Sequence, residues 1–391
     1  MKTKRAQSSE PAAGRGAARG GAGAAAWPAW EVAGLVVGVK LVVLMYGAQA
    51  FTTLRDQRLA SLYNWLAIWS QWDAPHYLDL ARDGYVSGGV QARWIVFYPL
   101  YPWLVRASAV VLRDELVSAF FVSAVASVAA GLLLYRLARL DEAEAVARAS
   151  VFFLLTFPTA YFLHIGYTES LFLALALGAF AGARGGRWWV AGLLGAAAGM
   201  TRVNGLLLVP ALACEAFEQH RAGGWRWRWD HLWALAPGLG FGVYLLINFH
   251  VFGDPFAFLR AQDQFWYKQL TWPWEGVVKT WEAVAGRAPA ESLMVGWQEL
   301  FFVLVGLGGV VWSWASLRAS YAVWMSLNWL LWTSTSFVLS VPRYTLVMFP
   351  LYILLARAAA RWPVAGGLVV VWSLLFMGLF IGRFVTGNWA F

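Results

Sequence analysis

The chain has 391 residues, of which 60% are hydrophobic and only 13% are charged. This composition excludes an ordinary soluble protein of two or three domains. A membrane-spanning helix needs roughly 20 apolar residues, so the hydrophobic residues suffice for about ten or eleven spans. The net charge of +9 leaves two explanations open, an anionic partner or basic cytoplasmic loops. The one cysteine, Cys214, excludes an intrachain disulfide.

Residues 1–26 are rich in Ala, Gly, Ser and Arg, so they are predicted to form a disordered cytoplasmic tail. Residues 27–391 are predicted to form a single transmembrane catalytic domain. Their apolar residues come in long runs without alternation, which favours an all-α polytopic bundle of about 11 helices over a β-barrel. The runs cover 27–50, 116–137, 150–166, 168–183, 188–201, 203–217, 231–251, 298–316, 320–339, 344–357 and 363–382.

The basic residues predict the orientation of the chain. A cytoplasmic amino terminus places sixteen of the 30 Lys and Arg residues in the cytoplasm and thirteen outside, with Lys40 inside the first span. Acidic and basic residues balance on the outer side, so nearly all of the net charge is cytoplasmic. Membrane orientation therefore explains the charge of +9, and no nucleic-acid partner is predicted.

Two long segments, about 52–115 and 252–297, are predicted to lie outside. In the first, residues 74–83 should form an amphipathic helix on the membrane surface that ends at Gly84. Asp73 precedes this helix, and its carboxylate has two compatible interpretations. It could cap the first backbone N–H groups, or it could take a proton from an acceptor hydroxyl.

Further polar residues gather at the same predicted face. Pro99 and Pro102 indicate a broken segment that returns into the membrane. Ionisable groups near a membrane core are costly and are therefore functional candidates, although a single Arg at a helix end can simply reach the headgroups. His76 alone is typical of a hydrogen-bonded structural histidine. The candidates in three outer turns are His164, Tyr167, Glu169, Arg202, Asn204, Arg343 and Tyr344.

Five short motifs resemble the PIG-V family, the second mannosyltransferases of GPI synthesis and their bacterial relatives, within the GT-C class of polytopic glycosyltransferases. The first motif runs from Trp72 through His76 and Tyr77 to Tyr85. The others are Phe97-Tyr98-Pro99-Leu100-Tyr101-Pro102, Gly166-Tyr167-Thr168-Glu169-Ser170, Arg202-Val203-Asn204-Gly205 and Pro342-Arg343-Tyr344. The likeness extends from about residue 60 to residue 350.

The resemblance implies transfer of mannose, or a related hexose, from a polyprenyl-phosphate sugar to a lipid or glycan acceptor on the non-cytoplasmic face. It implies Asp73 as the catalytic residue. The richness in Ala, Gly, Arg and Trp is typical of a bacterial plasma-membrane protein, so the acceptor of the GPI pathway is not carried over. The substrate-binding candidates are Trp72, His76, Tyr77, Tyr98, Tyr101, His164, Tyr167, Glu169, Arg202, Asn204, Arg343 and Tyr344.

One carboxylate suffices for this chemistry because a lipid phosphate leaves without protonation, unlike the alcohol in glycoside hydrolysis. Arg202 and Arg343 are the candidates that would stabilise the phosphate, with Arg343 preferred because Pro342 restrains it. No cofactor and no metal site are predicted. Two other functions remain open: a lipid or solute transporter or flippase, and a non-catalytic membrane subunit in which Asp73 is only a cap.

Overall fold

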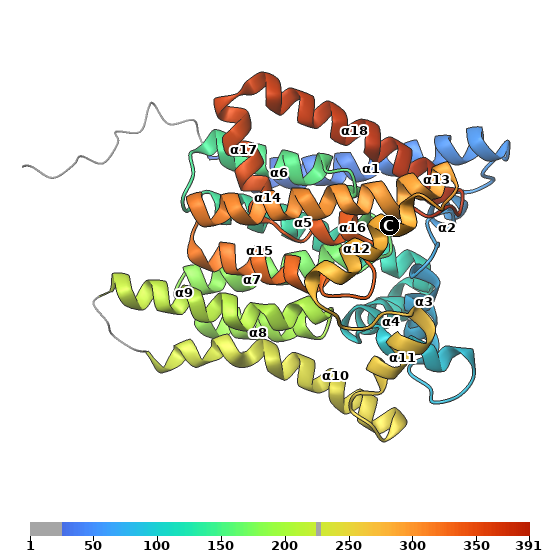
Figure 1. Cartoon of the computed structure of the whole chain (residues 1–391), viewed down its shortest axis with the longest axis horizontal. Coiled ribbons are helices and arrows are strands. Elements are labelled where there is room, and N and C mark those ends of the chain that lie inside the picture. Colours follow the sequence, from blue (N-terminus) through green and yellow to red (C-terminus); the bar gives the residue numbers. More distant parts are fainter. Residues whose placement is uncertain (1–25, 224–227) are drawn as a thin grey trace, which may run out of the picture.

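The computed structural model describes residues 26–223 and 228–391. The predicted disordered tail therefore lies almost entirely outside the described residues. Within them the chain is helical, apart from one isolated bridge between Leu270 and Thr335. The longer helices run side by side, and most of the short helices gather at one end of the bundle (Figure 1).

Each predicted apolar run contains a helix. These are α1 (Ala29–Arg55), α5 (Glu115–Ala138), α6 (Glu144–Thr156), α7 (Glu169–Arg184), α8 (Trp188–Gly199), α9 (Leu208–Ala222), α10 (Ala236–Phe252), α14 (Gln298–Ser316), α15 (Ala319–Thr333), α17 (Pro350–Arg361) and α18 (Pro363–Val385).

Not all of these helices are long enough to cross a membrane alone. Five helical stretches of the described chain have the necessary length and apolar character: Ala29–Arg55, Glu115–Ala138, Trp229–Phe252, Pro289–Ser316 and Pro363–Val385. The pair η1 (Val90–Val96) and α4 (Leu100–Leu112), bent by 114°, makes a sixth if it counts as one broken span. The chain is thus an all-helical, multi-pass integral membrane protein with five or six candidate spans, fewer than the eleven expected.

Breaks in the apolar runs account for much of this difference. The run 150–166 is not one helix, because α6 ends at Thr156 and Pro158 interrupts it before the short helix η2 (Ala160–Leu163). The run 344–357 is also divided, because a short helix ends at Thr345 and α17 starts only at Pro350. Proline lacks an N–H donor and disfavours a helical conformation in the residue before it. Similarly, η3 (Val203–Leu207) precedes α9, and η4 (Trp229–Leu235) precedes α10.

Small residues allow α8 and α10 to pack closely. A Cβ atom on Gly240 would lie 1.8 Å from the carbonyl oxygen of Ala196, and one on Gly199 would lie 2.5 Å from that of Pro237. Larger residues at these two positions would push the backbones apart. Close approach through small residues is common where membrane helices associate, since lipid supplies no hydrophobic force between them.

The first predicted outer segment contains α2 (Leu62–Ala67), α3 (Ala74–Asp83), η1 and α4. Helix α3 has the predicted bounds, and its predicted apolar face, Tyr77, Leu80 and Ala81, is buried. Gly84 ends this helix with φ of 79°, a conformation that glycine adopts without steric cost. The amphipathic helix expected in this segment is confirmed.

The second predicted outer segment forms α11 (Ala257–Trp266), α12 (Pro273–Val284), α13 (Pro289–Ser292) and η5 (Leu293–Trp297). Helix α11 contacts the first segment, where the Arg93 guanidinium lies 4.4 Å from the centre of the Phe265 ring. Trp272 and Trp274 stack on each other and remain exposed. The two segments therefore meet at one end of the bundle, and their exposed aromatic side chains suit a membrane interface.

Candidate functional site

Four predicted residues from different turns form one ion-pair cluster, which we call the outer cluster. Asp73 Oδ2 accepts a hydrogen bond from Arg343 Nη1 at 2.8 Å. Arg343 Nε donates to Glu169 Oε1 at 2.5 Å, and Arg202 Nη1 donates to the same Glu169 oxygen. The chain separates Asp73 from Arg343 by 270 residues, so the fold alone brings the two together.

The Asp73 carboxylate does not cap α3. The backbone carbonyl of Asp73 accepts the N–H groups of His76 and Tyr77 at 3.1 and 3.2 Å, while its side chain makes no capping bond. The interpretation of this side chain as only a cap is therefore wrong. Its Oδ1 atom has no hydrogen-bond partner in the described chain, and the side chain is 27% exposed. One carboxylate oxygen thus stays available to a substrate hydroxyl.

Glu169 has a different environment from Asp73. It is the first residue of α7, its side chain is fully buried, and it is paired with both Arg202 and Arg343. Arg202 also donates to Thr168 Oγ1 at 2.9 Å. Because Glu169 is inaccessible, it compensates the charge of the two guanidinium groups, and Asp73 is the more accessible carboxylate of the outer cluster.

A buried acid that sequence reasoning missed holds Arg343 in place. Arg343 lies on α16 (Val341–Thr345), which follows Ser340 with φ of 67°. The carboxylate of Glu299, on α14, accepts the N–H groups of Ser340 and Val341, each at 2.7 Å. The sequence signal for Glu299 was a lone acid near the start of the apolar run 298–316.

Tyr167 connects the first outer segment to the outer cluster. Its hydroxyl donates to the carbonyl oxygen of Gln71 at 2.7 Å and accepts the N–H of Asp73 at 3.3 Å. The guanidinium of Arg343 lies 5.0 Å from the centre of the Tyr167 ring. Tyr77 meets Tyr167 and Tyr101 edge to face. These three predicted tyrosines therefore form buried support behind Asp73 and Arg343.

Three other predicted residues border the site without an ionic contact to the outer cluster. His76 stacks on Trp94 with ring centres 3.6 Å apart. Burial lowers the pKa of His76 below its ordinary value, although the nearby carboxylates of Asp73 and Asp79 oppose this. Trp72 packs edge to face against Trp389. Tyr344 presents its ring to Arg202, whose guanidinium lies 5.5 Å from the ring centre.

The remaining predicted residues lie apart from the outer cluster and make no hydrogen bond to it within the described chain. Asn204 donates to Asn328 Oδ1 at 2.7 Å, which joins η3 to α15. Tyr98 stacks on Tyr244 with ring centres 4.0 Å apart. His164 is fully buried, and neither of its ring nitrogens has a hydrogen-bond partner. The contacts of Asn204 and Tyr98 are typical of helix packing. Asn204 lies in the same turn as Arg202 of the outer cluster.

Gly205, in the turn that carries Arg202 and Asn204, allows two backbone segments to pack closely. A Cβ atom on Gly205 would lie 2.3 Å from the backbone nitrogen of Gly199. A larger residue would therefore push η3 away from the end of α8. Since Arg202 immediately precedes η3, the glycine allows the guanidinium of Arg202 to reach Glu169.

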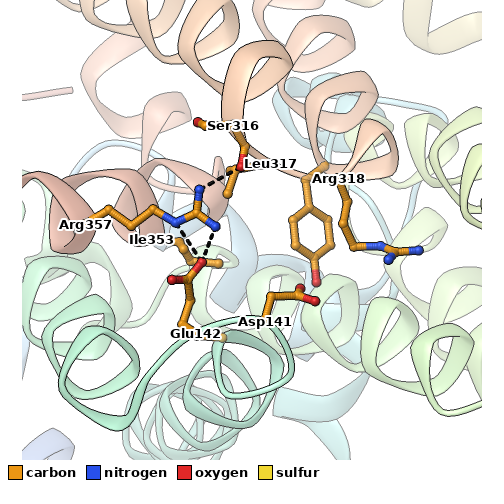
Figure 2. Close-up of a pocket in the computed structure, with 9 residues that line it drawn as sticks. Asp141, Glu142, Ser316, Leu317, Arg318, Ile353 and Arg357 are labelled. Carbon is orange, nitrogen blue, oxygen red and sulfur yellow. Dashed lines mark hydrogen bonds and ion pairs between the residues drawn. The ribbon is translucent and has the colours of Figure 1, made fainter. Parts of the chain in front are cut away.

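A second group of charges lies around a cavity of about 270 Å³ that contains none of the outer-cluster residues (Figure 2). Arg184 forms two bonds with Asp141, Arg318 pairs with Glu215, and Arg357 pairs with Glu142. Arg184, Arg318 and Arg357 are among the sixteen basic residues that the sequence predicts to be cytoplasmic. Because the charges pair with one another, we interpret this group as a brace between helix ends.

Removal of Arg357 should weaken this brace without affecting the outer cluster. Its guanidinium bonds Glu142 and, at 2.6 Å, the carbonyl oxygen of Ser316 (Figure 2). Arg357→Met is expected to destabilise the protein by about 1.5–3 kcal/mol, the range for hydrogen bonds to charged groups. A fall in the melting temperature of purified protein in detergent would show this, with the exposed Arg361→Met as control. An unchanged melting temperature for Arg357→Met would contradict the interpretation.

Comparison with known proteins identifies the region that carries most of these residues. Residues 47–222 match the model of a family described as Mannosyltransferase (PIG-V). This part of the chain, which we call the PIG-V region, is similar to that family. The PIG-V region contains Asp73, Glu169 and Arg202, whereas Arg343 lies beyond it. The predicted resemblance is therefore confirmed for four of the five motifs.

Curated relatives agree with this similarity. GPI alpha-1,6-mannosyltransferase 2 of Rattus norvegicus is 32% identical over 178 residues, which cover 41% of this chain and 34% of that protein. The protein of the same name from Mus musculus is 32% identical over 151 residues, which cover 35% of this chain and 29% of that protein. The chain thus spans about a third of the length of these relatives.

Among solved structures, the archaeal oligosaccharyltransferase AglB from Archaeoglobus fulgidus, in complex with an inhibitory peptide and a dolichol-phosphate, is similar with a TM-score of 0.45. The sequences are 10% identical, and the match covers 91% of this chain and 56% of that one. The similarity of residues 47–222 to the PIG-V family therefore rests on the family model and the curated relatives.

Proposed function

We propose that this protein transfers mannose, or a related hexose, from a polyprenyl-phosphate sugar to an acceptor hydroxyl. The PIG-V region supports the class of reaction. The observation that carries the proposal is the outer cluster, in which a partly exposed carboxylate is held by a buried Arg that is itself paired with a second acid. Such an arrangement orients one carboxylate and leaves one of its oxygens free.

In this mechanism Asp73 is the general base. Its free Oδ1 accepts the proton of the acceptor hydroxyl while that oxygen attacks the anomeric carbon. The bond between the anomeric carbon and the phosphate oxygen breaks on the opposite face, so the configuration is inverted. The leaving phosphate keeps the bonding electron pair and needs no proton. Arg343 keeps the carboxylate in one orientation through its bond to Oδ2.

The basic residues of the site stabilise the negative charge of the leaving phosphate. Arg343 was preferred from the sequence, but its guanidinium already bonds two carboxylates and is 7% exposed. Arg202 is paired only with Glu169 and is 12% exposed. We therefore assign Arg202 the larger part in binding phosphate, and Arg343 the orientation of Asp73.

The proposal includes the setting of the reaction. The end of the bundle with the outer cluster faces the non-cytoplasmic side, the amino terminus is cytoplasmic, and the chain forms a single transmembrane domain. Six helices other than the five long ones, α6, α7, α8, α9, α15 and α17, complete an eleven-helix GT-C-like bundle. The outer cluster lies at helix ends, whereas transporters place their polar sites near the midplane of the membrane.

Metal chelation offers a direct test of the single-carboxylate mechanism. Within residues 26–223 and 228–391, no group of three or more His, Cys, Asp and Glu side chains is placed to hold a metal ion. We expect sugar transfer by the purified protein to continue at an unchanged initial rate after treatment with EDTA. Loss of activity in EDTA that Mg²⁺ or Mn²⁺ restores would contradict this mechanism.

A further inference from the structure

Lys268 lies beside the outer cluster although it belongs to none of the sequence motifs. It follows α11 and the left-handed residue Tyr267, whose φ is 55°. The next residues pair with the segment that leads to α16: the N–H of Ser336 donates to Gln269 at 2.9 Å, and the N–H of Thr271 donates to Ser334 at 3.1 Å. The backbone therefore fixes Lys268 relative to the segment that carries Arg343.

The ammonium group of Lys268 shares an aromatic ring with Arg202. Lys268 Nζ lies 5.7 Å from the centre of the Tyr344 ring, and Arg202 Cζ lies 5.5 Å from the same point. Both cations thus lie against the ring of Tyr344, beside the outer cluster. Cation–π contacts of this kind stabilise a charge only modestly, by about 0.5–1 kcal/mol where they are exposed.

Lys268 has no acidic partner. No Asp or Glu oxygen of the described chain lies within 4.0 Å of its ammonium group, and its one hydrogen bond, to the carbonyl oxygen of Leu339, is long at 3.4 Å. Arg343 and Arg202 are both paired with carboxylates. Glu299 lies close enough to interact electrostatically with Lys268, but its carboxylate oxygens accept the N–H groups of Ser340 and Val341. Lys268 is therefore the basic residue of this site that makes no ion-pair contact within the described residues.

We infer that Lys268 and Arg202 together bind the phosphodiester of the donor beside Tyr344, while Arg343 stays bound to Asp73 and Glu169. This inference rests on the proposed function and adds to it a binding residue from the second outer segment. Lys268 would hold the donor in the ground state and also offset charge that remains on the phosphate as it leaves.

Direct binding of the donor tests this inference. The purified full-length chain is placed in nanodiscs of zwitterionic phosphatidylcholine, and the dissociation constant of radiolabelled polyprenyl-phosphate mannose is measured. Lys268→Met is expected to raise this constant about 10- to 100-fold, since a hydrogen bond to a charged group is lost. Lys268→Arg should restore binding to within a few-fold. Lys279→Met, which removes an exposed lysine of α12, should leave it unchanged.

The outcomes separate this inference from the proposed function. Wild-type binding by Lys268→Met, with an unchanged melting temperature, overturns the role of Lys268 while donor binding by the wild type still supports the proposed donor. Failure of the wild type to bind the donor at all overturns both. A third measurement repeats the binding experiment in nanodiscs that also contain phosphatidylglycerol. If Lys268→Met weakens phosphatidylglycerol binding but not donor binding, the lysine holds a phospholipid headgroup, and the inference is wrong.

Discussion

Replacement of Asp73 by Asn is expected to lower the rate of mannose transfer about 10²–10⁴-fold, the usual effect of losing a general base. The substitution keeps the size of the side chain and removes only its basicity. The protein should still fold, because the side chain does not cap α3 and is partly exposed. Initial rates of purified protein with polyprenyl-phosphate mannose, together with melting temperatures, would measure both effects.

Asp79→Asn is the matched control for this experiment. Asp79 lies on the same helix, α3, but no hydrogen bond or ion pair joins it to the outer cluster in the described chain. Its substitution should leave the rate near that of the wild type. If the two variants have equal rates, Asp73 is not the general base.

Replacement of Glu169 by Gln is expected to affect stability as well as activity. Glu169 is fully buried and is the carboxylate that pairs with both Arg202 and Arg343. Removing one partner from a buried ion pair usually costs about 3–5 kcal/mol, because the remaining charges lose their compensation. The variant should therefore melt at a lower temperature than both the wild type and Asp73→Asn. Its transfer rate should also fall, since Arg343 would no longer be held in place.

The exposed acid Glu282 provides the control for this substitution. It lies on α12, outside the outer cluster, so Glu282→Gln should change neither melting temperature nor rate. Normal stability of Glu169→Gln would mean that the two guanidinium groups find other partners. The description of Glu169 as their main compensating charge would then be wrong.

Local patterns predicted the local structure well. Helix α3 was predicted with the bounds that it has, because its apolar spacing, the proline in its first turn and Gly84 at its end all agree. The lengths of the membrane helices were predicted less well. Hydropathy alone treated 150–166 and 344–357 as continuous, whereas Pro158 interrupts the first run and the second is broken between Thr345 and Pro350.

The residues of the outer cluster could be predicted as polar groups at one face, but their pairing could not. Spacing along the chain allowed the Asp73 side chain to cap a helix, to serve a site, or both, and only the fold shows that it bonds Arg343, 270 residues away, and caps nothing. Glu299 and Lys268 were missed for a related reason. Each acts through a segment distant in sequence, Glu299 through the backbone of residues 340–341 and Lys268 through the ring of Tyr344.

Reconstitution of the purified protein tests the central claim most directly. Proteoliposomes that contain the protein and a lipid extract as the source of acceptor are given radiolabelled polyprenyl-phosphate mannose and no sugar nucleotide. We predict a labelled product whose anomeric configuration is opposite to that of the donor. A transporter or a non-catalytic subunit would form no product. Absence of product with the wild-type protein, or retention of the donor's configuration, would contradict the proposed mechanism.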